Sequence, residues 1–239
     1  MAETIMNIVE QSNFLDSFKS IIEPIANEAI NKYGICNVGL SGGSLVNLLE
    51  LVLPKIETTW KNWQFFFCDE RIVSYDDPES TYGLYKKKLI GILPINENQF
   101  IKVNTKLSAN EAAIDYEKEL KSHFGDHLPE FDLLLLGLGP DGHTCSLFPH
   151  HALLNENKLW VAPINDSPKP PPSRVTLTFP VINNARNCLF AISGKGKADI
   201  LQRIFLGDED LPANRVKPTS GKLHWLVDTA AARNLQSFS

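Results

Sequence analysis

Apolar residues occur along the chain in two patterns: continuous runs of about five residues, and stretches with three- and four-residue spacing. The continuous runs are typical of strands buried on both faces, and the spaced stretches are typical of amphipathic helices. The runs predict strands at 35–40, 63–68, 100–103, 131–136, 159–164, 174–179, 188–193 and 224–228. The spacing predicts helices at 13–33, 45–53, 80–92, 108–124 and 195–205.

Local signals set the ends of some of these helices. Pro24 lies inside the first helix and is expected to bend or interrupt it, because proline lacks the N–H that a helix interior needs. Gly34 and Pro54 end the first two helices. Ser108, with Glu111 three residues later, forms a capping-box pattern at the start of the clearest helix.

Strands that alternate with helices of about 10–15 residues indicate an α/β fold. We expect a mainly parallel, Rossmann-like sheet with helices on both faces, built as a single domain over residues 1–239. In such sheets ligands bind at the carboxyl ends of the strands. The loops of interest are therefore 41–44, 68–71, 137–143, the segment before Arg174, and 193–197.

The composition is that of an ordinary globular protein, with 239 residues and a formal net charge of -5. An acidic chain has no general attraction for nucleic acid or for acidic lipid, so an anionic ligand needs locally placed basic residues. The four cysteines include no CxxC pair, and the N-terminal segment lacks the features of a signal peptide. No apolar run approaches the length of a membrane span. A cytoplasmic protein without an obligate protein partner is the simplest expectation.

The segment SGGS, residues 41–44, follows a predicted strand and opens a helix. Glycines at 42 and 43 allow a ligand to approach the backbone, and free N–H groups at a helix start favour phosphate. Ser44 adds a hydroxyl donor, although a tight turn with an N-cap serine explains the segment as well. The overlapping GLSGG also matches a nucleophile elbow with Ser41. This alternative is weak because no oxyanion segment precedes the strand.

Charged residues follow other predicted strands. CDER at 68–71 places Asp69 and Arg71 at the end of a buried strand, where they can contact a sugar or a carbonyl. Arg174 and Lys197 bring positive charge to the same edge of the sheet. Each of these residues alone is compatible with an ordinary surface position. Together with SGGS, they predict a local phosphate site.

The segment GLGPDGHTCSLFPHH, residues 137–151, has three possible meanings. Its G-x-G-x-x-G resembles a dinucleotide fingerprint, but Pro149 leaves no room for the helix that must follow. Its His and Cys residues match no standard zinc spacing. The third interpretation, which we favour, is a glycine turn that presents His143 as a proton acceptor, with Asp141 as a possible partner.

Five segments in order make the sequence resemble the 6-phosphogluconolactonase family, within the larger group that includes glucosamine-6-phosphate deaminase. They are GLSGGSLVNLL, FFFCDERIVSYDDPESTYGLYKK, FDLLLLGLGPDGHTCSLFP, PPSRVTLTFPVIN and the segment with Gly194 and Lys197. The resemblance covers about residues 35 to 228. One departure is Thr81 in STYG, where asparagine is expected.

The resemblance implies hydrolysis of 6-phosphoglucono-1,5-lactone to 6-phosphogluconate, the second step of the pentose phosphate pathway, with no metal or organic cofactor. It assigns His143 as general base, Asp69 and Arg71 to the sugar end, and Ser44, Arg174 and Lys197 to the phosphate. Two alternatives remain: a deaminase-like isomerase and a non-catalytic sugar-phosphate sensor. The deaminase is disfavoured because Arg71 follows the Asp-Glu pair and because GHTCSLFP contains no acid.

Overall fold

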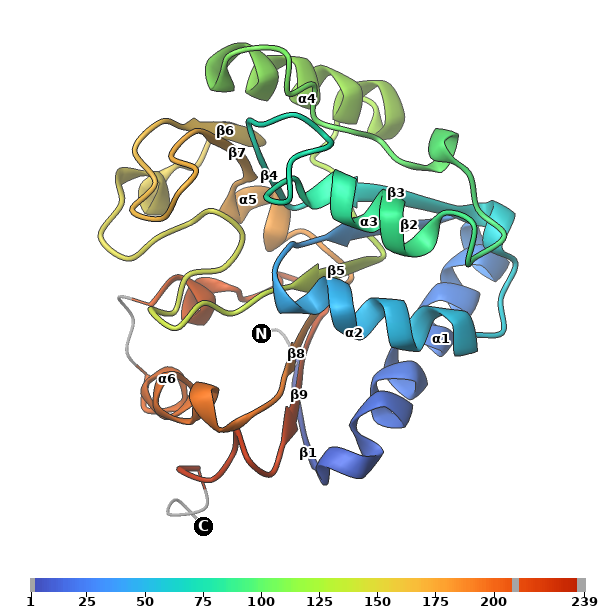
Figure 1. Cartoon of the computed structure of the whole chain (residues 1–239), viewed down its shortest axis with the longest axis vertical. Helices are drawn as coiled ribbons and strands as arrows, with labels where there is room; N and C mark the ends of the chain where they lie inside the picture. Colours follow the sequence, from blue (N-terminus) through green and yellow to red (C-terminus); the bar gives the residue numbers. More distant parts are fainter. Residues whose placement is uncertain (1–2, 208–210, 236–239) are drawn as a thin grey trace.

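The computed structural model describes residues 3–207 and 211–235, and its centre is a six-stranded sheet in which all neighbouring strands are parallel (Figure 1). The order across the sheet is β1-β9-β8-β5-β2-β3. The strands are Glu3–Val9 (β1), Cys36–Leu40 (β2), Trp63–Phe67 (β3), Leu133–Leu136 (β5), Asn187–Ile192 (β8) and Lys222–Asp228 (β9). This arrangement confirms the predicted α/β class.

Helices cover both faces of the sheet (Figure 1). One face packs against α1 (Phe14–Tyr33), α2 (Ser44–Val52) and α3 (Thr81–Leu89), and the other core contains residues of α4 (Ala109–Phe124), α5 (Phe179–Ile182) and α6 (Ala198–Phe205). Successive leucines of β5 point to opposite cores, and all four are fully buried. Burial on both faces explains why this strand is a continuous apolar run.

A second sheet lies beside the first and corrects one expectation. It is antiparallel, with the order β4-β7-β6, and consists of Asp69–Arg71 (β4), Val161–Ile164 (β6) and Arg174–Leu177 (β7). The sequence predicted the strands at 159–164 and 174–179 but placed them in a largely parallel sheet. An apolar run indicates burial and does not specify which strand it pairs with.

Two further details differ from the sequence prediction, and one of the two alternatives for Pro24 is excluded. The edge strand β1 was missed because its side chains are mostly exposed and no apolar run marks it. The predicted strand at 100–103 is absent, since Phe100 makes only an isolated bridge with Phe65. Pro24 does not interrupt α1, a helix of 20 residues in which Ile22 and Ala26 on either side are buried.

The boundary between the neighbouring strands β2 and β5 defines where a ligand can enter. These two strands are neighbours, yet from β2 the chain continues to β3 on one side, while from β5 it continues to β8 and β9 on the other. Such a switch point opens a crevice at the carboxyl ends of the strands. Short 3-10 helices complete the loops: Gln11–Asn13, Leu53–Lys55, Trp60–Asn62, Glu97–Gln99, Ala152–Asn155, Lys195–Lys197 (η6) and Pro212–Arg215.

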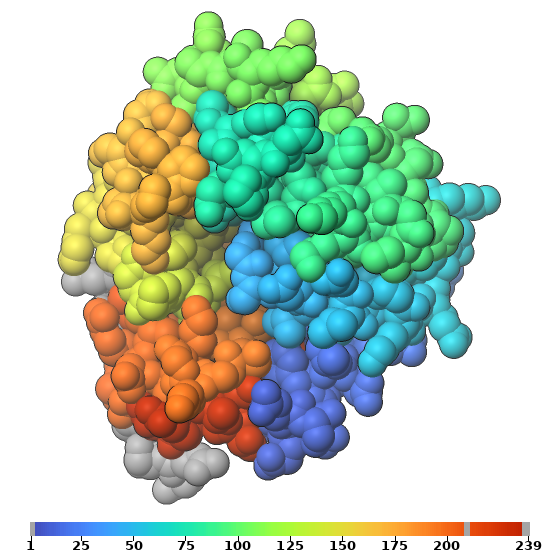
Figure 2. Space-filling view, viewed as in Figure 1, coloured from blue at the N-terminus to red at the C-terminus, as the bar shows by residue number. Residues whose placement is uncertain are grey.

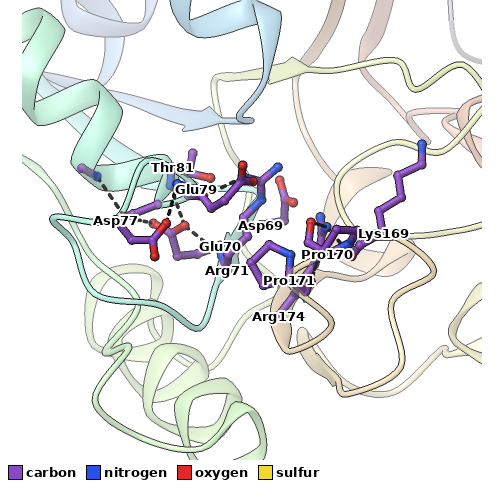
Figure 3. Close-up of polar contacts among 12 residues, drawn as sticks. Asp69, Glu70, Arg71, Asp77, Glu79, Thr81, Lys169, Pro170, Pro171 and Arg174 are labelled. Atoms are coloured by element: carbon purple, nitrogen blue, oxygen red, sulfur yellow. Dashed lines mark hydrogen bonds and ion pairs between the residues drawn. The ribbon is translucent and has the colours of Figure 1, made fainter.

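Glu70 fixes strand β4 against the start of α3. Its buried carboxylate accepts backbone N–H groups of Arg71, Thr81 and Tyr82 at 2.7–2.8 Å. Burial raises the pKa of Glu70 to about 7, against the opposing effect of these hydrogen bonds. Figure 3 shows the side chain between the two segments that it joins. The neighbours of Glu70 on β4 are Asp69 and Arg71, so this carboxylate also positions two predicted site residues.

We expect Glu70→Gln to lower the free energy of unfolding by about 2 kcal/mol, because the amide NH2 then faces a buried backbone N–H. Urea unfolding measures the change. The matched control is Glu119→Gln on the outer side of α4, which is expected to change stability by less than about 0.5 kcal/mol. Equal stability of the two variants would contradict the role of Glu70.

Candidate active site

A cavity of about 200 Å³ opens at the carboxyl ends of the central strands. It contains all eight residues that the sequence predicted for the site, from five separate segments of the chain. In the space-filling view the blue, yellow-green and orange surfaces of these segments meet on one face (Figure 2). The lining residues are Ser41, Gly42, Gly43, Ser44, Asp69, Arg71, Gly137, Leu138, Gly139, His143, Cys145, Arg174 and Lys197.

The SGGS loop delivers the start of α2 to this cavity. Gly43 precedes the helix with φ 72°, a left-handed conformation that favours glycine. Gly42 lies so close to α3 that an added Cβ would be 3.0 Å from Thr81 Oγ1. The first N–H groups of a helix have no carbonyl partner within the helix, so this end of α2 suits an anion.

Ser41 lies at the cavity wall but lacks the surroundings of a nucleophile. Its side chain is buried, and its Oγ has no hydrogen-bond partner among the described residues. An activated serine needs a base within hydrogen-bond reach. The His143 ring contacts Asp141 and Lys169 through Nδ1, so the geometry gives no support to the nucleophile-elbow interpretation.

The glycine turn after β5 is shaped around the imidazole of His143. The turn is closed by backbone hydrogen bonds from Gly139 N to His143 O and from Gly142 N to Gly139 O. A Cβ at position 139 would lie 1.9 Å from His143 Nδ1, so a side chain there is incompatible with the ring. The glycines of GLGPDG therefore make room for a histidine, which is a different task from binding a dinucleotide.

Asp141 fixes the orientation of that histidine. Its Oδ1 is 2.5 Å from His143 Nδ1, and the ring of Phe148 packs beside the imidazole. Burial raises the pKa of Asp141, but hydrogen bonds from His143 and Lys169 outweigh it and hold the pKa at about 2. An ionised Asp141 requires the proton of the neutral imidazole on Nδ1, which leaves the lone pair on Nε2.

The electrostatic surroundings keep His143 neutral. Burial is the largest effect and lowers its pKa, Asp141 raises it, and Lys169 lowers it, with a net decrease from the ordinary value of 6.5. At neutral pH the ring is therefore an unprotonated base. The sequence had suggested Asp141 as a partner but gave no signal for Lys169, which lies 26 residues further along the chain.

Asp69 and Arg71 reach the cavity from β4. Asp69 accepts a hydrogen bond from Ser146 Oγ at 2.8 Å and is almost completely buried. Arg71 uses one guanidinium nitrogen for Glu79, while its Nε is buried without a partner among the described residues (Figure 3). A buried N–H without a partner costs free energy unless a ligand supplies the acceptor. Arg71 also lines the cavity and brings positive charge to it.

Arg174 is more fully engaged than the sequence suggested. Its Nε donates to Pro171 O at 2.9 Å, and its Nη2 donates to Lys169 O and Pro170 O (Figure 3). Its Nη1 has only a long contact of 3.4 Å, to Ser146 Oγ. Most of the guanidinium therefore holds the 169–171 loop in place, and only Nη1 has donor capacity left for a phosphate.

Lys197 reaches the cavity from the end of η6, beside the start of α6. Its Nζ donates to the carbonyl of Leu138 at 2.5 Å. Burial and the nearby Lys169 lower the pKa of Lys197, and Asp141 raises it. An ammonium group with one carbonyl acceptor keeps two further donors. Those donors suit the oxygens of a phosphate group.

The described residues hold no cluster of three or more His, Cys, Asp or Glu side chains that would suit a metal ion. His151 instead accepts the Leu153 N–H through Nδ1 and contacts Asp166 through Nε2. Cys145 is buried. These contacts give the His and Cys residues of the 137–151 segment separate structural surroundings rather than a common centre.

Comparison with known proteins agrees with the geometry. The family model for glucosamine-6-phosphate isomerases/6-phosphogluconolactonase matches residues 10–225. The chain belongs to this family. It is 54% identical over 206 residues to 6-phosphogluconolactonase of Homo sapiens, covering 83% of this chain and 80% of the human protein. It is 44% identical over 230 residues to a probable 6-phosphogluconolactonase of Drosophila melanogaster, covering 95% and 93% of the two chains.

Solved structures of the family share the fold. The crystal structure of 6-phosphogluconolactonase from Thermotoga maritima superposes with a TM-score of 0.84 at 30% identity, covering 95% of this chain and 100% of that one. The enzyme from Trypanosoma cruzi gives a TM-score of 0.83 at 28% identity, with 98% and 97% covered. The lactonase branch of the family is therefore the one that this chain resembles in both sequence and structure.

We expect Arg174→Met to lower the free energy of unfolding by about 3 kcal/mol, since three loop carbonyls lose a buried cationic donor. Thermal or urea unfolding measures the loss. Arg233→Met removes an exposed arginine and serves as the control, with little expected change. Unchanged stability of Arg174→Met would show that the guanidinium does not hold the loop.

Proposed function

We propose that this protein hydrolyses 6-phosphoglucono-1,5-lactone to 6-phosphogluconate, with His143 as the general base. The proposal depends mainly on one observation: a neutral His143, oriented through Nδ1 by Asp141, lies at the wall of the cavity. The same cavity is lined by the basic residues Arg71, Arg174 and Lys197 and by the backbone of the glycine loops. Lactone hydrolase activity also agrees with the names of the relatives reported above. No covalent intermediate is needed, because a lactone is an activated ester.

The proposed reaction begins with a water molecule between His143 Nε2 and the ring carbonyl. Nε2 takes a proton from this water as its oxygen forms a bond to C1 of the lactone. The imidazolium that results is stabilised by Asp141. When the tetrahedral intermediate collapses, the bond from C1 to the ring oxygen breaks, and the imidazolium returns the proton to that oxygen. The product is the open-chain acid, and His143 is again neutral.

The developing negative charge on the carbonyl oxygen needs hydrogen-bond donors. Arg71 lines the cavity with its guanidinium charge, and backbone N–H groups of the glycine loops are the other donors there. Donors that are already in place need not reorganise during the reaction. Asp69, held by Ser146, is suited to accept a sugar hydroxyl.

The phosphate of the substrate is proposed to bind where α2 begins. The donors there are Ser44, the backbone of Gly42 and Gly43, Lys197 and the remaining Nη1 of Arg174. Binding energy from this remote group holds C1 near His143. The sibling deaminase reaction is not favoured, because the segment from His143 to Pro149 contains no acid that would open a sugar ring.

Residues 1–239 are proposed to act as one domain, since both apolar cores pack on a shared central sheet. Within residues 3–207 and 211–235, no helix combines the length and apolar character of a membrane span. All four cysteines are buried free thiols, which supports a reducing, cytoplasmic compartment. The substrate is the one partner proposed.

We expect His143→Asn to lower kcat by about 10²–10⁴-fold, the usual contribution of a positioned base. The assay follows freshly generated lactone and subtracts spontaneous hydrolysis. Affinity for 6-phosphogluconate is expected to stay close to wild type, which shows that the cavity is intact. Undiminished catalysis in this variant would eliminate His143 as the base.

We expect Lys197→Ala to act mainly on KM, raising it about 10–100-fold through loss of a charged hydrogen bond to phosphate. Phosphate-free gluconolactone is the control substrate, and its slow turnover should change little in the variant. If wild type hydrolysed the two lactones equally well, the proposed phosphate site would be wrong.

A further inference from the structure

Lys169 contacts the proposed base but is not one of the residues that line the substrate cavity. Its Nζ is 2.9 Å from Asp141 Oδ1 and 3.1 Å from His143 Nδ1. His143 lines the cavity, whereas Lys169 and Asp141 are absent from its wall. Nδ1 and Nζ therefore share one carboxylate oxygen, and both groups donate to it. Lys169 therefore acts on the proposed base through this carboxylate and through its own charge, which also reaches Lys197.

Hydrogen bonds from two side chains, Ser167 and Arg174, hold the backbone of Lys169 in place. Ser167 Oγ donates to Lys169 O at 2.8 Å and accepts from Lys169 N at 3.2 Å. Arg174 Nη2 donates to the same carbonyl, and Figure 3 shows Arg174 beneath the Lys169–Pro171 segment. A lysine side chain normally loses rotamer entropy when it is held in one position. A fixed backbone places its ammonium group without further ordering of the loop.

The positive charge of Lys169 counteracts the effect of two negative charges on the protonation of His143. Asp141 carries a negative charge next to His143, and a bound phosphate dianion adds negative charge to the same cavity. Both favour the imidazolium form, which is not a base. An ammonium 3.1 Å from Nδ1 disfavours that form by direct repulsion. The lysine also leaves Asp141 ionised and able to orient the ring.

We propose that Lys169 is a positioning residue that keeps His143 unprotonated while Asp141 holds the ring in place. The inference rests on the proposed role of His143 as base, and it adds a third member to the pair that the sequence suggested. Asp141 and Lys169 thus have opposite effects on the same imidazole. The loop of Lys169, Pro170 and Pro171 thus helps to position the proposed base.

Other groups also surround His143 and must be considered in any titration. Asp69 on β4 lies near enough to favour the imidazolium. Arg71, Arg174 and Lys197 line the same cavity and carry positive charge. Phe148 covers the ring with its centroid 4.8 Å away. These groups stay constant when position 169 alone is changed, so a difference between variants reports on Lys169.

The test is an NMR titration of the His143 ring in wild type, Lys169→Met and Lys169→Arg, with His143→Asn to assign the resonance. We expect the midpoint to move to higher pH in Lys169→Met and to stay near wild type in Lys169→Arg. Lys195→Met is the matched control: it removes an exposed lysine near the cavity that makes no hydrogen bond or ion pair among the described residues, and it should leave the midpoint unchanged.

An unchanged or lowered midpoint in Lys169→Met would overturn the proposal. If Lys169→Met fails to fold, Lys169→Gln is measured in its place, with the same expected result. The pH profile of kcat separates this inference from the proposed function. If the NMR midpoint rises while the acid limb of kcat stays in place, Lys169 acts on His143 as proposed, but His143 is not the base. If both move upward together, the two proposals are supported together.

Discussion

The central parallel sheet is buried on both faces, and this constraint decides where chemistry can occur. Polar side chains cannot enter either face without partners, so they gather where the strands end. The carboxyl ends of β2 and β5 meet at the point where the chain changes direction across the sheet. The SGGS loop and the glycine turn of His143 follow these two strands, and both line the same cavity.

Within that cavity, buried charges are held by partners that also position them. Glu70 joins β4 to α3 and thereby places Asp69 and Arg71. Arg174 caps three carbonyls and thereby fixes the loop of Lys169. Asp141 holds His143 in the tautomer that exposes Nε2. The same hydrogen bonds that offset the cost of burying charge thus preorganise the groups that a lactone requires.

Much of this arrangement could be predicted from the sequence, and the failures share a physical cause. Continuous apolar runs located β2, β3, β5 and β8, because burial on both faces leaves a local signature. The exposed edge strand β1 lacks that signature. The antiparallel sheet was misplaced because pairing depends on distant partners. His143 and Asp141 are two residues apart and were recognised together, whereas Lys169 is distant in sequence and is placed beside them by hydrogen bonds of Ser167 and Arg174 to its backbone.

The central claim is that the substrate lies with its phosphate at the start of α2 and its carbonyl carbon at His143. A crystal structure of the complex with 6-phosphogluconate measures this placement directly. We expect the C1 carboxylate to lie within about 3–3.5 Å of His143 Nε2 and the phosphate to contact Ser44 and Lys197. A complex in which the phosphate occupies the His143 side, with C1 turned away from the imidazole, would contradict it.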